Sequence, residues 1–242
     1  MQLRLPTSVS EAQGCLAEGA VPIGGATLVW ATWQRDGFPE QAMSLRGLPE
    51  ANVVERDALG GAVVLHRVDD RVPEVLRLAA SSVGTGAVRR TATVGGNVVG
   101  STLRCLLPAA LVLDARARVL TPDGAYETDL AELVAKRPLL LSLHWREPVA
   151  SAYLKLEGDA GGPPPLVVAA AVHTDTDGSN RMRVAVRDGY EVLADSAAYD
   201  PGTEAEQVVQ ALARTDVGAL HPMAWDVVRR HVTDLLDRPT VR

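Results

Sequence analysis

The sequence contains few cysteines. Cys15 and Cys105 are the only two in 242 residues, and they form no Cys-x-x-Cys pair. Disulfide frameworks and iron–sulfur clusters need several cysteines, and structural zinc sites need closely spaced Cys or His ligands. The five histidines show no ligand spacing such as His-x-x-x-His. We therefore predict neither a disulfide framework, nor an iron–sulfur cluster, nor a metal site in this chain.

Long hydrophobic runs and a surplus of basic residues are also lacking. The longest apolar runs, such as 139–143 and 166–172, are too short to span a bilayer, and the first residues do not resemble a secretion signal. Lys and Arg number 24 against 30 Asp and Glu, which gives a net charge of −6. Nucleic-acid binding needs clustered Lys and Arg. We expect a cytoplasmic protein with no membrane and no nucleic-acid partner, so an anionic ligand would be held by backbone dipoles.

The pattern of elements predicts an α+β fold. Apolar residues recur at helical spacing over 72–82, 204–214 and 225–236, and Ser8 or Ser10 can cap a helix that ends near residue 18. Strands and helices alternate irregularly, which argues against one doubly wound sheet. The other predicted elements are strands at 3–5, 21–23, 43–48, 139–145, 166–173 and 182–187, the end of a strand at 88–94, hairpins pairing 52–55 with 61–65 and 117–120 with 125–128, helices at 26–33 and 130–135, and a helix or strand at 106–113.

Two glycine pairs stand out, Gly24-Gly25 and Gly95-Gly96. Glycine has no Cβ, so a pair can turn with φ > 0 and lets the backbone approach a ligand closely. Successive N–H groups in such a turn form a concave anion site. The first pair precedes a predicted helix, whose free N–H groups would point back at the turn. Two such turns that face each other could clamp a diphosphate.

The residues around both pairs resemble a known family, the FAD-binding subunits of molybdenum hydroxylases, which include those of xanthine dehydrogenase and carbon monoxide dehydrogenase. Ile23-Gly-Gly-Ala-Thr-Leu28 is similar to the family's Ala-Gly-Gly-Thr-Asp-Leu loop. Arg89-Arg-Thr-Ala-Thr-Val-Gly-Gly-Asn97 is similar to its Arg-Asn-x-Ala-Thr-Ile-Gly-Gly-Asn. Segments 45–50, 61–66 and 107–114 resemble its following segments in the right order, and Tyr153-Leu-Lys155 resembles the start of its C-terminal domain.

The resemblance implies a PCMH-type FAD-binding domain of two small α/β subdomains over residues 1–147. A small C-terminal domain of one sheet plus helices would follow over 148–242. FAD would lie with its diphosphate on both glycine turns and would pass electrons between iron–sulfur and molybdenum partner subunits and an acceptor. The residues implied in cofactor binding are Ile23, Gly24, Gly25, Ala26, Thr27, Leu28, Thr93, Val94, Gly95, Gly96, Asn97, Ser101, Thr102, Cys105 and Lys155. No residue is identified as catalytic.

The sequence departs from the family pattern at two places. Thr27 replaces the acidic residue of the first loop, and Cys105 stands where the family's Ser-Pro-x-x-Asp motif has its aspartate. These changes leave two alternatives open. One is a stand-alone flavoenzyme that oxidises a small organic substrate, such as a secondary metabolite. The other is a relative that has lost flavin and serves as a scaffold or a non-redox catalyst. The donor, the acceptor and a homo-oligomeric state are not fixed by the sequence.

Overall fold

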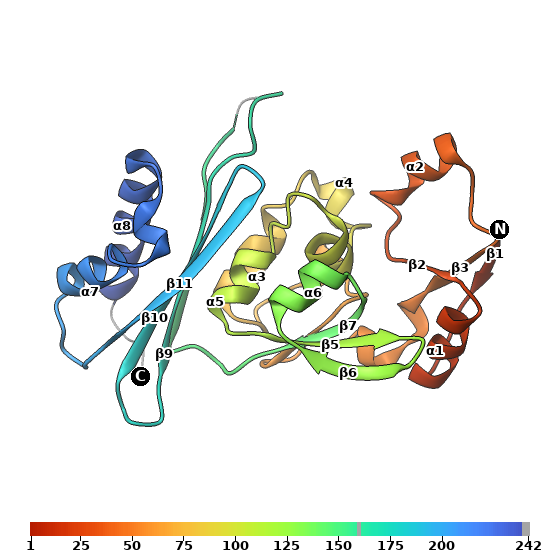
Figure 1. The fold of residues 1–242 in the computed structure, drawn as a ribbon, viewed down its shortest axis with the longest axis horizontal. Coiled ribbons are helices and arrows are strands. Elements are labelled where there is room, and N and C mark those ends of the chain that lie inside the picture. Colours follow the sequence, from red (N-terminus) through yellow and green to blue (C-terminus); the bar gives the residue numbers. More distant parts are fainter. Residues whose placement is uncertain (159–160, 239–242) are drawn as a thin grey trace.

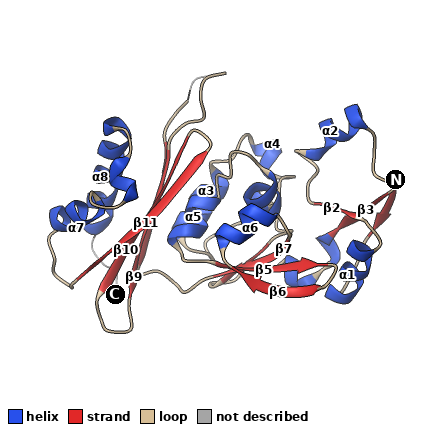
Figure 2. Cartoon of the chain, in the orientation of Figure 1, coloured by secondary structure: helices blue, strands red, loops and turns tan. Residues whose placement is uncertain are grey.

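The chain is organised around three sheets that follow one another along its length (Figures 1 and 2). The computed structural model describes residues 1–158 and 161–238. Residues 159, 160 and 239–242, which belong to the predicted C-terminal domain, lie outside the described part. The helices and strands mix as the α+β prediction requires.

The N-terminal unit is a small parallel sheet with one packed helix. Its strands are β1 (Gln2–Arg4), β2 (Val21–Ile23) and β3 (Gln41–Ser44), in the order β1-β3-β2. Helix α1 (Val9–Ala17) is capped by Ser8, whose Oγ accepts the Glu11 N–H at 3.2 Å, and it packs Ala12 and Cys15 against Met43. Helix α2 (Val29–Asp36), in contrast, buries no residue.

The central unit is an antiparallel sheet covered by four short helices. Strands β4 (Ala58–Gly60), β5 (Arg116–Thr121), β6 (Gly124–Thr128) and β7 (Leu139–His144) lie in the order β4-β7-β5-β6. The helices are α3 (Glu74–Ser81), α4 (Gly86–Arg89), α5 (Leu107–Val112) and α6 (Leu130–Lys136). Shorter 3-10 segments cover Leu45–Gly47, Pro49–Ala51 and Leu65–Arg67, and a π-helical turn covers Gly96–Gly100.

The C-terminal unit is an antiparallel meander between two layers of helices. Strands β8 (Ala150–Lys155), β9 (Val167–Thr174), β10 (Asn180–Asp188) and β11 (Glu191–Tyr199) pair in sequence order, followed by α7 (Ala205–Leu212), a 3-10 turn (Asp216–Ala219) and α8 (Pro222–Leu236). In β9, Ala170 and Val172 face the α7–α8 core, while Ala169 and Ala171 face the central core. This alternation follows from the two-residue period of a strand. None of the described helices is both long and apolar enough to cross a membrane.

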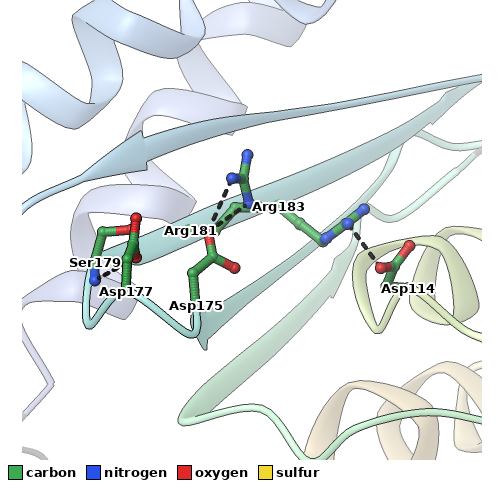
Figure 3. Close-up of polar contacts among 6 residues, drawn as sticks. All are labelled: Asp114, Asp175, Asp177, Ser179, Arg181 and Arg183. Atoms are coloured by element: carbon green, nitrogen blue, oxygen red, sulfur yellow. Dashed lines mark hydrogen bonds and ion pairs between the residues drawn. The ribbon is translucent and has the colours of Figure 1, made fainter.

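Polar contacts fasten the C-terminal sheet to the end of α5 (Figure 3). Arg183 of β10 forms an ion pair with Asp114 at 2.9 Å across this boundary, and the His173 Nε2 lies 2.8 Å from the Val112 carbonyl oxygen. Arg181 pairs instead with Asp175 at 2.8 Å within its own sheet. Because burial lowers the pKa of His173, its neutral ring is favoured and Nε2 carries the proton donated to that carbonyl.

Most predicted elements are confirmed, with instructive exceptions. The predicted hairpin of 52–55 with 61–65 is wrong: Val54 forms a single bridge, to Leu59 of β4, and β4 itself pairs with β7. The predicted strand end at 88–94 is also wrong, since α4 occupies its beginning and only Thr93 forms a bridge, to Val64. The sequence analysis missed β11, and the segment 106–113, left open, forms α5 with Pro108 in its first turn.

Arg187 of β10 is a buried cation with few partners. Its side chain is 1% exposed, and its Nη2 donates to the Pro165 carbonyl oxygen at 2.7 Å. Its Nε and Nη1 find no hydrogen-bond partner among the described residues. Buried donors without partners cost free energy, whereas an apolar group of similar shape carries no such cost.

We therefore expect Arg187→Met to raise the free energy of unfolding by ~1 kcal/mol, as measured by denaturant titration of the purified protein. The matched control is Arg183→Met, which removes the partly exposed ion pair with Asp114 and should lower stability by about 1 kcal/mol or less. A loss of stability in Arg187→Met larger than that of the control would contradict the expectation.

Candidate functional site

The first glycine loop, Gly24–Leu28, joins β2 to α2. Ala26 adopts φ 56°, in the left-handed region, and the Trp30 N–H then returns to its carbonyl at 3.0 Å. Leu28, at the N-cap position of α2, offers no side-chain oxygen. Within the described residues, the backbone N–H groups of Gly25–Leu28 have no hydrogen-bond acceptor. The loop therefore presents a series of free donors at a helix N-terminus, which is the arrangement that binds anions.

In the second glycine loop, Thr91–Asn97, the amides of the glycine pair and of Asn97 already have acceptors within the protein. The Gly95 N–H donates to the Gly61 carbonyl at 2.8 Å, the Gly96 N–H to Thr93 Oγ1 at 3.2 Å and the Asn97 N–H to the Thr93 carbonyl at 2.9 Å. The prediction that amides of both loops grip one anion is thus supported by free donors on the first loop alone. The second loop lines the cleft with Thr93, Gly95 and Gly96.

The two glycine loops touch each other directly. A Cβ placed on Gly25 would overlap the Thr91 carbonyl oxygen, and one placed on Gly24 would overlap Thr93 Oγ1. Neither pair has positive φ, so the expectation that these glycines provide left-handed turns is wrong. Gly24 and Gly25 are needed because only residues without Cβ let the first loop come this close to the second, whereas a Cβ on Gly95 would instead meet the Gly61 carbonyl oxygen at 3.0 Å.

A cleft of about 310 Å³ lies along this contact. That volume is at the lower end of the range of ~300–1,000 Å³ for small-molecule pockets, which are typically apolar with a few polar groups. Of the predicted site residues, the cleft is lined by Ile23, Gly24, Gly25, Ala26, Thr27, Leu28, Thr93, Gly95 and Gly96. The structure thus brings residues about seventy positions apart in the chain to one cavity.

The other predicted residues lie outside this cleft. Val94 and Cys105 are buried in the central core, where Cys105 is 3% exposed. Asn97 is buried too, and its Oδ1 accepts the Leu106 N–H at 2.9 Å, which fixes the start of α5. The Ser101 Oγ accepts the Leu103 N–H at 3.2 Å and so shapes the chain after the π-helical turn.

Thr102 and Lys155, the remaining two, line a second and more open crevice at the edge of β8. We call it the outer crevice; its walls also include Leu103, Glu157, Pro165 and Tyr190. The Lys155 Nζ donates to the Ser82 carbonyl at 2.9 Å, and the Tyr153 hydroxyl lies 3.1 Å from Ser82 Oγ. Burial raises the pKa of Tyr153 to about 12, so this hydroxyl keeps its proton at neutral pH.

Sequence reasoning missed several residues that line the cleft. The clearest is Gly61, which belongs to a third glycine pair, Gly60-Gly61, and the pair itself was the signal that could have found it. Arg137 gave no signal in the sequence, because it follows a helix far from either glycine loop. The missed lining residues are Pro22, Val29, Leu45, Gly61, Ala62, Val99, Gly100, Arg137, Pro138, Leu139 and Leu140.

Two solved protein structures resemble this fold over almost its whole length. The structure is similar to the Cu,Mo-CO dehydrogenase in its cyanide-inactivated form, with a TM-score of 0.71 and 17% sequence identity, covering 98% of this chain and 96% of that chain. It is also similar to quinoline 2-oxidoreductase from Pseudomonas putida 86, with a TM-score of 0.69 and 17% identity, covering 98% and 95%. At these identities the likeness concerns the fold.

In sequence, no curated protein matches the chain. A family model does, over residues 1–143: the FAD binding domain in molybdopterin dehydrogenase. The match spans both glycine loops, the whole cleft and the central sheet, which is more than half of the 242 residues. The chain therefore belongs to the family of FAD-binding domains of molybdopterin dehydrogenases, and its cofactor is FAD.

Proposed function

We propose that the FAD diphosphate binds in the cleft against the first glycine loop. The observation that carries this proposal is the series of free backbone N–H groups over Gly25–Leu28, on residues that line the cleft together with Gly95 and Gly96 of the second loop. Such donors are suited to a diphosphate because they combine hydrogen bonds with the positive end of the helix dipole. The Thr27 hydroxyl, on the same loop, adds a side-chain donor.

The flavin end of the cofactor is proposed to reach the outer crevice. Gly100 lines the cleft and Thr102 lines the outer crevice, so a short stretch of chain connects the two cavities. A dinucleotide is larger than the cleft alone, and it would use both. Thr102 and Lys155 would then hold the flavin end, and Lys155 shares Ser82 with the neutral Tyr153 hydroxyl.

We infer that the chain serves as the flavin component of a molybdenum hydroxylase. Bound flavin supplies the redox chemistry, while the protein supplies binding, orientation and electrostatics. With Cys15 and Cys105 both buried and far apart in sequence, the described chain has no thiol set for an iron–sulfur cluster. Iron–sulfur and molybdenum groups would therefore come from partner subunits. Residues 148–242 would form the C-terminal domain that closes the outer crevice.

The first experiment measures FAD binding and its dependence on the loop contact. Wild-type protein should show a flavin absorbance spectrum, and its stability should rise by ~2.7 kcal/mol when free FAD is at a hundred times its Kd. We expect Gly25→Ala to lose FAD binding at least tenfold, because its Cβ meets the Thr91 carbonyl oxygen and separates the loops.

The matched control is Gly14→Ala in α1, where a Cβ meets nothing within 4 Å. It should bind FAD as the wild type does. Colourless protein that FAD does not stabilise would overturn the proposed function and would favour the relative that has lost flavin. Flavin reduction by a small organic molecule, without any partner protein, would favour the stand-alone flavoenzyme.

A second prediction concerns Cys105. Its burial in the central core, outside the cleft, means that Cys105→Ala should leave the Kd for FAD unchanged within about twofold, while the smaller side chain costs ~1 kcal/mol of stability. Titration with FAD and thermal unfolding of the same preparation measure both. Loss of FAD without loss of stability would instead place the thiol at the cofactor.

A further inference from the structure

Arg137 is the only residue with an ionisable side chain among those that line the cleft in the described part of the chain. It follows α6 directly, and its exposed side chain forms no hydrogen bond or ion pair with another described residue. Its neighbours Pro138 and Leu139 also line the cleft and lead into β7, the second strand of the central sheet order. Arg137 therefore lies at the wall of the cavity, and its guanidinium has no competing partner among the described residues.

The backbone of Arg137 adopts an unusual conformation for its residue type. Its φ of 51° and ψ of 45° are left-handed, and its N–H closes the last turn of α6 on the Leu133 carbonyl at 2.9 Å. Glycine or asparagine is the usual residue at such a helix end, because a Cβ is disfavoured there. Non-glycine residues held in this region often mark functional positions. Glycine would adopt this backbone conformation with less strain, so the fold alone does not account for an arginine here.

The cleft also needs a cation that the glycine loops do not supply. A diphosphate carries negative charge, the chain has a net charge of −6, and the amides of Gly95, Gly96 and Asn97 are already bonded within the protein. The first loop offers dipoles but no full charge. A guanidinium matches phosphate oxygens with two parallel N–H donors, which makes arginine the best complement to such a loop.

We propose that Arg137 binds the diphosphate, with the first glycine loop supplying the remaining donors, and so sets the preference of the cleft for a phosphorylated ligand. This assignment rests on the proposed function, in which a dinucleotide lies in this cleft. Arg137 is a binding residue for the phosphates and takes no part in the redox step.

The test compares Arg137→Gly, Arg137→Lys and the control Lys136→Ala, whose lysine pairs with Glu132 at 2.7 Å and does not line the cleft. FAD binding is measured by flavin fluorescence at low and high salt, and ADP binding by calorimetry. Arg137→Gly should weaken FAD and ADP at least tenfold and reduce the salt dependence, because one charged hydrogen-bonded contact is lost. The lysine variant should retain part of the affinity, and the control all of it.

Thermal unfolding without ligand separates binding from folding. Because glycine tolerates positive φ, Arg137→Gly should leave the melting temperature of the ligand-free protein unchanged or raise it, so weaker binding cannot be attributed to misfolding. Wild-type affinity for FAD and ADP in Arg137→Gly would overturn the proposal. If the wild type binds ADP but not FAD, the proposed flavin function fails, while loss of ADP in Arg137→Gly still supports the phosphate contact. If the wild type binds neither, both fail.

Discussion

The site depends on one steric constraint, the direct backbone contact between the two glycine loops. Gly25 lies against the Thr91 carbonyl oxygen and Gly24 against Thr93, with no space for a Cβ on either. This contact holds the end of β2, in the N-terminal unit, beside the bridge between Val64 and Thr93 in the central unit. The cleft lies along this contact, and its lining combines glycines of both loops with apolar side chains such as Leu45 and Leu140.

The two glycine loops have similar sequences, but their backbone N–H groups differ in whether they are already hydrogen-bonded. In the second loop the N–H groups of Gly95, Gly96 and Asn97 serve the fold, and the Asn97 side chain extends that role by holding the start of α5. In the first loop the corresponding groups remain free. One glycine pair thus supports the fold and the other is the proposed ligand surface, although both roles follow from the same lack of a Cβ.

The sequence predicted that the glycine pairs form one site, but it gave the wrong reason for them. A glycine pair in a sequence indicates that a Cβ is not tolerated at those positions. The sequence alone does not distinguish a positive φ from a close neighbouring backbone as the cause. The long amphipathic helices were predictable because their apolar residues recur at helical spacing, and strand β9 because it is a continuous apolar run. Strand β11 was missed because its outward residues interrupt the alternation, and Arg137 because its place at the cleft results from tertiary packing.

The N-terminal unit has little core of its own, and this affects how the protein behaves as an ensemble. Its buried cluster combines three alanines, Cys15 and Met43 with Leu45 and Leu48 from the segment after β3 and with Leu120 and Leu141 from the central sheet, and α2 buries nothing. Regions with so little apolar contact open at a lower free energy than the rest of a protein. Under the proposed function, a nucleotide bound between the first glycine loop and the central sheet would link the two units across that weak boundary. Ligand binding in the cleft should therefore slow amide hydrogen exchange throughout β1, β2 and β3, well beyond the atoms that contact the ligand.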